Sequence, residues 1–175
     1  MNVAFDTLDA RFGRMRDYLA GLQGVRRMAR RGDLDPFRFP DLLPFVNLID
    51  VVLENDGVRF RFRLVGTAQS EATQLDYTGR FVDDVVDPAS RPRVLEDLTR
   101  VVATCMPHYG RYGMPFPGHG FIDSERVLYP LSADERMVDC ILALHRYPDL
   151  AVPRIEAQDW HLGAWRQAKV DDPDR

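Results

Sequence analysis

Residues 46–67 of the chain read VNLIDVVLENDGVRFRFRLVGT, and this stretch decides the fold. Its second half alternates strictly between arginine and apolar side chains, the apolar positions being Val58, Phe60, Phe62 and Leu64. Such alternation is typical of an antiparallel strand with one face on a core. The triplet Asn55-Asp56-Gly57 is a strong turn signal that separates this strand from the apolar run 46–53. We therefore predict a β-hairpin over residues 46–65.

Periodicity predicts one long helix and three more strands further along the chain. Apolar residues recur with helical spacing from Pro88 to Cys105, and Pro107 forbids continuation of that helix. A short helix is expected from Thr67 through Thr73, and a weak one over residues 155–170. The three strands are expected at about 108–115, 124–132 and 137–146. Antiparallel strands with helices gathered on one face predict an α+β fold.

The N-terminal segment predicts a further helix with a narrow apolar stripe, formed by Phe5, Leu8, Phe12, Met15, Leu19 and Leu22. The steps of three and four residues between these positions are those of a coiled-coil seam. Gly21 and Gly24 are natural helix ends. The stripe either covers the sheet of its own domain or forms the seam of a homodimer, and the pattern alone leaves both hypotheses open.

The composition restricts the class of protein. The chain has 175 residues, 45% of them hydrophobic and 29% charged, which is typical of one globular domain. It contains no apolar run long enough to span a membrane, and charged residues interrupt the first 21 positions, where a signal peptide would need an apolar run. The only cysteines are Cys105 and Cys140, too few for a disulfide framework. With a net charge of −4, we expect a cytoplasmic protein that binds neither nucleic acid nor a membrane.

The order of elements and several short phrases resemble the PAS domain family, specifically its small stand-alone bacterial members. The matching phrases are Arg26-Arg27-Met28, Asp33-Leu34-Asp35-Pro36, Leu42-Leu43-Pro44, residues 60–67 (FRFRLVGT), Thr78-Gly79-Arg80, residues 125–132 (ERVLYPLS) and Val138-Asp139. The resemblance covers about Tyr18 to Tyr147. It implies a five-stranded antiparallel sheet that cups a small pocket, in a domain that senses a ligand or dimerises. It leaves the cofactor unknown, because PAS pockets hold different cofactors or none.

This resemblance divides the chain into an N-terminal amphipathic helix (1–25), a PAS-like domain (26–150) and a C-terminal extension (151–175). In a cupped sheet, the inward strand faces line the pocket. Alternation nominates as apolar lining Phe60, Phe62, Leu64, Met114, Leu128, Cys140 and Leu142. The nominated polar contacts are His108, Tyr109, Arg111 and Tyr112, with Arg111 suited to a carboxylate or phosphate. Two alternatives remain: the cup is filled by its own side chains, or the third strand is displaced by one residue, which would exchange its faces.

Motifs for catalysis are weak. No glycine-rich phosphate loop, nucleophile elbow or His-Glu-x-x-His sequence is present. Five side chains of the kinds that bind metals occur in the second half of the chain, at Cys105, His108, His119, Cys140 and His145. We therefore predict a non-enzymatic sensory or regulatory domain that binds a small molecule or a signalling partner, and that dimerises through the N-terminal helix. The alternatives are a ligand-free protein-interaction module and a metal-dependent enzyme that uses Cys105, His108, Cys140 and His145.

Overall fold

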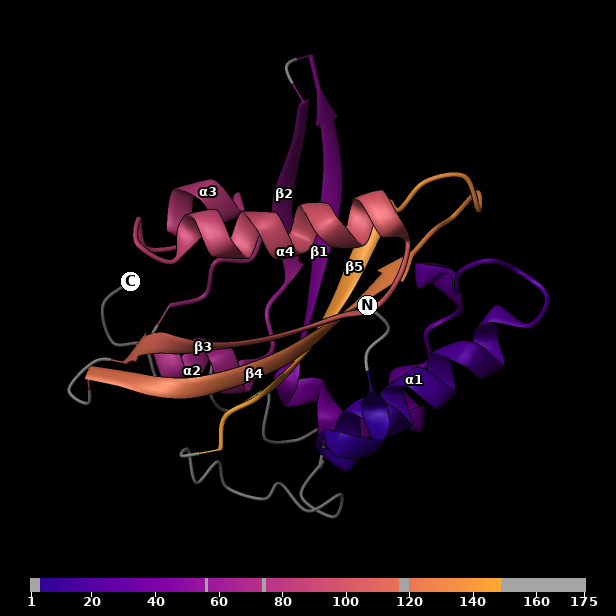
Figure 1. The fold of residues 1–175 in the computed structure, drawn as a ribbon, viewed down its shortest axis with the longest axis horizontal. Coiled ribbons are helices and arrows are strands. Elements are labelled where there is room, and N and C mark those ends of the chain that lie inside the picture. The colour runs from indigo at the N-terminus through magenta and orange to yellow at the C-terminus, as the bar shows by residue number, and fades with distance from the viewer. Residues whose placement is uncertain (1–3, 56, 74, 117–119, 149–175) are drawn as a thin grey trace, which may run out of the picture.

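The predicted hairpin forms the first two strands of a five-stranded antiparallel sheet (Figure 1). The computed structural model describes residues 4–55, 57–73, 75–116 and 120–148. The strands are β1 (Val46–Glu54), β2 (Gly57–Leu64), β3 (His108–Phe116), β4 (Gly120–Leu131) and β5 (Cys140–Arg146). Their order across the sheet is β2-β1-β5-β4-β3, so β1 and β5 are neighbours at the centre although they are far apart in sequence. All five strands were predicted within a few residues of these bounds.

The helices are α1 (Ala10–Gln23), α2 (Thr67–Thr73), α3 (Val82–Val85) and α4 (Arg91–Thr104). The long helix α4 begins three residues after the predicted Pro88 and ends at Cys105, which has left-handed backbone angles. Between α1 and β1 the prolines favour 3-10 turns over a helix. These turns are η2 (Arg31–Asp33), η3 (Pro36–Arg38) and η4 (Pro40–Phe45), and a further turn, η1 (Phe5–Thr7), precedes α1. The helix predicted over 155–170 lies outside the described residues.

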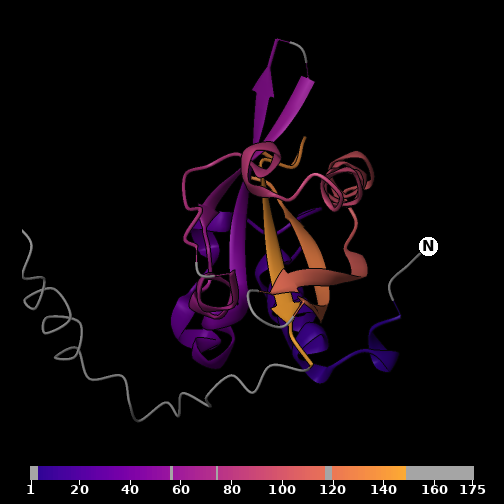
Figure 2. The same ribbon diagram turned by 90° about the vertical axis from the view of Figure 1, so that its left-hand side faces the viewer.

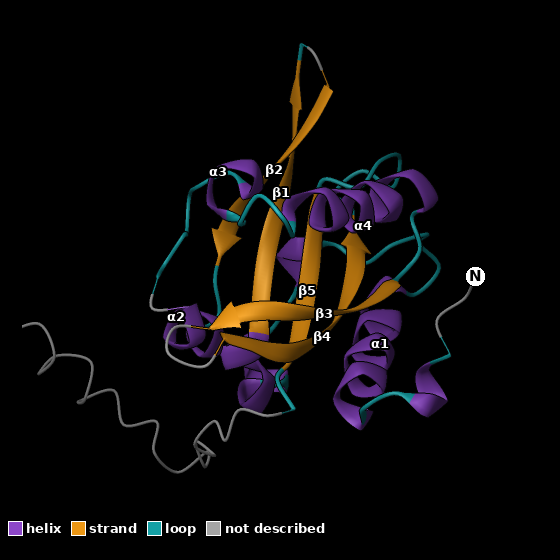
Figure 3. Cartoon of the chain, turned by 60° about the vertical axis from the view of Figure 1, so that its left-hand side comes forward, coloured by secondary structure: helices purple, strands orange, loops and turns teal. Residues whose placement is uncertain are grey.

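Buried side chains form two clusters, one on each face of the sheet. Figures 2 and 3 show how the helices are arranged around the sheet. On one face, α3 and α4 pack against β1, β2, β4 and β5. On the other face, α1 and η4 pack against β4 and β5. The central strand β5 supplies both clusters because its side chains alternate: Leu142 and Leu144 point towards α1, and Ile141 and Ala143 towards α4.

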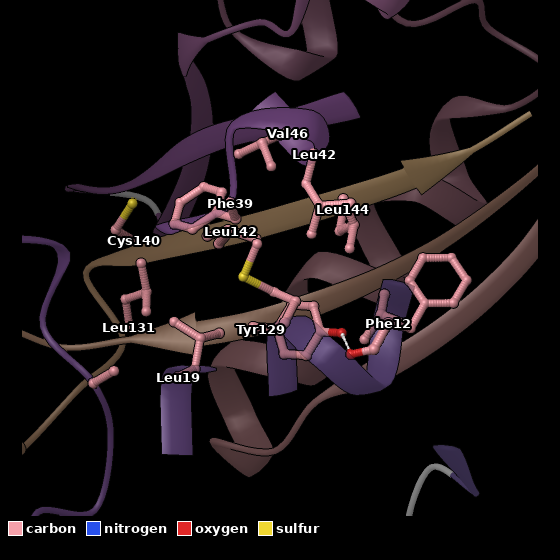
Figure 4. Close-up of a cluster of buried hydrophobic side chains, with 13 residues drawn as sticks. Phe12, Leu19, Phe39, Leu42, Val46, Tyr129, Leu131, Cys140, Leu142 and Leu144 are labelled. Atoms are coloured by element: carbon pink, nitrogen blue, oxygen red, sulfur yellow. Dashed lines mark hydrogen bonds between the residues drawn. The ribbon is translucent and has the colours of Figure 1, made fainter. Parts of the chain in front are cut away.

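Helix α1 covers its own sheet. It begins after Asp9, whose carboxylate accepts the backbone N–H of Arg11 as an N-cap. Its apolar stripe is buried against β4 and β5, with Phe12, Met15 and Leu19 at the contact (Figure 4). These three side chains belong to the core of one chain, which corrects the hypothesis that the stripe forms the seam of a dimer. The homodimer itself stays a prediction.

Candidate ligand-binding cavity

A cavity of about 190 Å³ lies on the other side of the sheet from α1, beneath α2, α3 and α4. Most of its wall is apolar, from Ile49, Phe62, Val82, Val86, Val94 and Leu98. Two of the helices over it, α2 and α3, are short, and non-helical segments at residues 65–66, 75–81 and 86–90 lie between β2 and α4. The sheet floor adds a small group of polar side chains at one end. A mostly apolar cavity with a few convergent polar groups is the usual form of a small-molecule site.

Asn47 organises the polar end of the cavity. Its Oδ1 accepts the backbone N–H of Gly66 at 2.8 Å, which fixes the orientation of the amide. Its Nδ2 donates to Oε1 of Gln69 at 2.6 Å and to Nε2 of His145 at 3.2 Å. The phenol of Tyr147 donates a second hydrogen bond to the same Gln69 oxygen. One hydrogen-bond network around the amide of Asn47 thus joins β1, α2 and β5.

This network fixes the proton on His145. Burial, and then the positive charge of Arg126, lower the pKa of the imidazole from 6.5 to about 3, so the ring is neutral near pH 7. Because Nε2 accepts the hydrogen bond from Asn47, the single ring proton resides on Nδ1. No hydrogen-bond partner for Nδ1 occurs among the described residues, although this atom is buried. This N–H of His145 is therefore buried without an acceptor among the described residues.

Arg126 has a second buried N–H without a partner. Its Nη2 donates to Oδ2 of the buried Asp97 at 3.0 Å, and its guanidinium lies over the ring of Tyr112, 4.7 Å from the centroid. The Nε–H has no partner within the described parts of the chain. Asp97 also accepts from Nε2 of His108 at 3.0 Å, so the carboxylate ties α4 to both β3 and β4. The ion pair compensates the charge of Arg126 inside the domain.

The structure brings only part of the nominated pocket together. Phe62 and Tyr112 line the cavity. Phe60 and Leu128 lie on the same sheet face but are packed into the apolar core beside it. Leu64 lies near the end of the edge strand β2 and is 43% exposed.

The remaining nominated residues lie elsewhere. Tyr109, Cys140 and Leu142 pack on the α1 face, because the assumed alternation was off by one residue along β5 and mixed the two faces of β3. Arg111 is exposed and pairs with Asp123 of β4. His108 binds Asp97 and does not line the cavity. The side chain of Met114 is outside the described part of the structure.

Several polar residues that line the cavity were not nominated from the sequence, among them Asn47, Gln69, Arg126 and His145. A signal was present for two of them. Asn47 and His145 each interrupt a run of apolar residues within a strand, and a polar side chain in such a run is buried and needs a partner. Arg126 gave no such signal, because its strand also contains other charged residues.

The hypothesis of a metal site formed by Cys105, His108, Cys140 and His145 is wrong, because these side chains do not converge. Cys140 and His145 point to opposite faces of β5. Burial raises the pKa of the Cys140 thiol to about 12, as expected for a core side chain. His108 is engaged with Asp97, and within the described residues no three acidic, histidine or cysteine side chains cluster as metal ligands. His119 lies outside those residues.

The chain belongs to the PAS domain family, because the model of that family matches residues 11–144, from α1 to β5. PAS domains are sensory and signalling modules. The chain is also similar to the N-terminal domain of a diguanylate cyclase with a PAS/PAC sensor from Marinobacter aquaeolei, at 10% identity and a TM-score of 0.44 over 58% of this chain and 94% of that one. A fungal LOV domain photoreceptor is similar at 14% identity and a TM-score of 0.44, over 80% of this chain and 92% of that one.

No curated protein matches the sequence significantly. Among the described residues, none of the helices has both the length and the apolar character needed to cross a membrane.

Proposed function

We propose that this PAS domain is a non-catalytic sensory or regulatory domain that binds a small molecule in the cavity beneath α2, α3 and α4. The observation that carries the proposal is the cavity itself, a mostly apolar space of about 190 Å³ whose wall also carries the hydrogen-bonded polar side chains Asn47, Gln69 and His145.

A binding role fits the charged groups better than a catalytic one. A general base works best with a pKa near the working pH, but burial holds the pKa of His145 at about 3. Asp97 is occupied by Arg126 and His108. A neutral, buried His145 and an ion-paired Asp97 suit recognition rather than proton transfer.

A route for the signal runs through β5. His145 contacts the cavity, and the preceding Leu144 packs in the cluster formed with α1. A ligand that moves His145 therefore acts on the strand that supports α1. We propose that binding changes the packing of α1 on the sheet and that a signalling partner detects this change.

Native mass spectrometry of freshly purified protein tests the proposal, by comparison with the denatured mass. We expect an adduct that is released on denaturation. Phe62→Trp should fill the cavity and abolish the adduct. Phe60→Trp is the matched control, because Phe60 is equally buried two residues away but does not line the cavity. Loss of the adduct in both variants, or its retention in Phe62→Trp, would count against this cavity.

The second candidate is a ligand-free interaction module, and the β1–β2 hairpin favours it. The hairpin projects beyond the rest of the sheet (Figures 1 and 3). Near its tip Leu53 and Val58 are cross-strand partners and are 61% and 40% exposed. Because β2 is an edge strand, a second copy of the chain is the natural occupant of this surface. Under this hypothesis the protein is a dimer without adduct, and Leu53→Asp converts it to a monomer in sedimentation.

A further inference from the structure

The polar side chains at the closed end of the cavity are bonded to one another. Nδ2 of Asn47 donates to Gln69 and to His145. The same Gln69 oxygen accepts from the phenol of Tyr147, and Nε2 of Gln69 donates to the hydroxyl of Tyr77 at 3.4 Å. These hydrogen bonds form within the protein, so the polar end of the wall is satisfied before any ligand binds.

The polar side chains of the wall beside α2 and α4 are bonded in the same way. The hydroxyl of Tyr77 donates to Oγ1 of Thr73 at 2.9 Å. Before α4, the carboxylate of Asp87 accepts the backbone N–H of Ala89 at 2.9 Å and that of Ser90 at 3.2 Å. A hydrogen bond from the Ser90 side chain, together with these N–H groups, lowers the pKa of Asp87. These groups also have their partners in the chain.

Arg126 is directed into the protein and not towards a ligand. Its Nη2 donates to Asp97 at 3.0 Å and its Nη1 to the hydroxyl of Tyr112 at 3.3 Å. Its Nε lies below β3, 3.9 Å from the place that a Cβ would take at Gly110. Both this atom and Nδ1 of His145 are enclosed by the protein although the cavity is empty, so a ligand does not reach either of them.

The charges of the wall disfavour an ionised ligand of either sign. Among the described residues that line the cavity, the basic side chains are Arg126, which Asp97 already neutralises, and the neutral His145. An enclosed carboxylate would therefore lack a countercharge and would also meet the negative Asp87. An ammonium would have only Asp87 as a partner, and both oxygens of that carboxylate already accept backbone N–H groups.

We infer that the cavity selects a small, uncharged, apolar ligand, which contacts the valine, leucine, isoleucine and phenylalanine side chains and forms no hydrogen bond with the wall. This inference rests on the proposed function, since it assigns the chemical class of the proposed ligand. The polar side chains then hold the wall in shape, and a polar group on the ligand would lose its bonds to water without replacement. A 150 Å³ apolar cavity accommodates benzene, so about 190 Å³ fits a single ring with a short alkyl substituent.

Four ring compounds of similar size test the inference. Ethylbenzene is apolar, acetophenone has nearly the same shape with a neutral carbonyl, benzoate carries an anion and benzylamine a cation. Dissociation constants are measured by NMR titration of the full chain. We expect ethylbenzene to bind about tenfold more tightly than acetophenone, because the enclosed carbonyl oxygen finds no donor, and far more tightly than both charged compounds.

A pair of variants verifies where ethylbenzene binds. Phe62→Trp should fill the cavity and weaken the binding of ethylbenzene at least tenfold. Phe60→Trp, in the same strand but outside the cavity wall, should leave it almost unchanged. Equal binding by the wild type and Phe62→Trp would place the ligand elsewhere and would overturn the inference.

Gln69→Leu tests whether the internal hydrogen bonds exclude polar ligands. It removes the oxygen that accepts from Asn47 and Tyr147, so the wall is left with donors that lack this acceptor. We expect the preference for ethylbenzene over acetophenone to fall several-fold. Gln23→Leu is the matched control, because Gln23 is bonded to the carbonyl oxygen of Arg27 at the end of α1 and does not line the cavity. It should leave the preference unchanged.

The outcomes distinguish the inference from the proposed function. If acetophenone, benzoate or benzylamine binds in the cavity as tightly as ethylbenzene, the inference is wrong and the ligand-binding cavity stands. If Gln69→Leu keeps the full preference, the internal hydrogen bonds are not what excludes polar ligands, and that step of the inference is wrong. If none of the four compounds binds and the purified protein carries no adduct, the proposed function fails as well. An apolar adduct supports the inference, and a carboxylate or an amine overturns it directly.

Discussion

The phenol of Tyr129, in β4, donates a 2.6 Å hydrogen bond to the backbone carbonyl oxygen of Phe12, in α1 (Figure 4). The bond is buried and joins residues that are 117 positions apart. Burial raises the pKa of Tyr129 well above its ordinary value, so the phenol stays protonated and remains a donor throughout the stable pH range. This directional contact joins α1 to β4 in addition to the apolar packing of the stripe.

Tyr129→Phe removes this hydrogen bond and little else. We expect the free energy of unfolding to fall by about 1 kcal/mol, the usual net value of such a bond. Hydrogen exchange should accelerate in α1 more than in β1 and β2, because the bond holds the helix on the sheet. Urea denaturation and exchange measured by mass spectrometry check both effects. Uniform acceleration across the domain would show that the bond does not anchor α1 specifically.

The burial of the α1 stripe predicts that its disruption unfolds the chain. Phe12→Asp and Leu19→Asp each place a carboxylate in the core, and we expect a loss of more than about 3 kcal/mol from each. Val25→Asp is the control just beyond α1, where the side chain is fully exposed, and should be almost neutral. Denaturation and sedimentation are measured together. A folded monomer produced from a dimer by Phe12→Asp would restore the dimer-seam hypothesis.

The backbone at Gly66 lies very close to the backbone of Pro44 and Val46. A Cβ at this position would lie 2.3 Å from the carbonyl oxygen of Pro44 and 2.8 Å from that of Val46, so Gly66→Ala forces the backbone apart. We expect a loss of at least about 2 kcal/mol in stability. In Gly13→Ala, within α1, nothing lies within 4 Å of the new atom, and alanine should stabilise the helix by about 0.5–1 kcal/mol. Similar effects at both positions would contradict the close approach.

The neutral state of His145 predicts a pH dependence of stability. Its pKa is about 3 in the folded chain and about 6.5 in the unfolded chain, so between these values only the unfolded chain takes up the proton. His145 therefore does not reduce the free energy of unfolding above pH 6.5. Below that value the free energy of unfolding decreases as the pH falls towards 3. We expect a slope of about 1.4 kcal/mol per pH unit between about pH 6 and 4.5, above the range where carboxylates titrate. His145→Phe should flatten this slope in chemical denaturation, and an unchanged slope would show that another group titrates there.

The hairpin and the order of helices and strands along the chain could be predicted because their signals are local. The alternation from Val58 to Leu64 indicates both the strand and its buried face, and β2 has that alternation because only one of its faces is covered. The stripe of α1 likewise predicted which side chains are buried. What covers the stripe could not be predicted, because an apolar face has the same sequence whether it meets its own sheet or another chain.

The lining of the cavity was harder to predict for a physical reason. Strand β5 is covered on both sides, and residues 140–145 are all buried, so hydrophobicity does not distinguish its two faces. The choice of Cys140 and Leu142 therefore rested on parity alone and was wrong. The polar floor depends on the register that places Arg126 opposite His145, and pairing between distant strands is not visible in either strand by itself.

The double covering of β5 has a consequence for how this domain can change over generations. Even-numbered positions such as Leu142 and Leu144 meet α1, and odd-numbered positions such as Ile141 and His145 meet the cavity side. Under the proposed function, a substitution at an even position would alter the anchorage of the helix, and a substitution at an odd position would alter what the cavity accepts. These two properties could then drift separately along a single strand of seven residues.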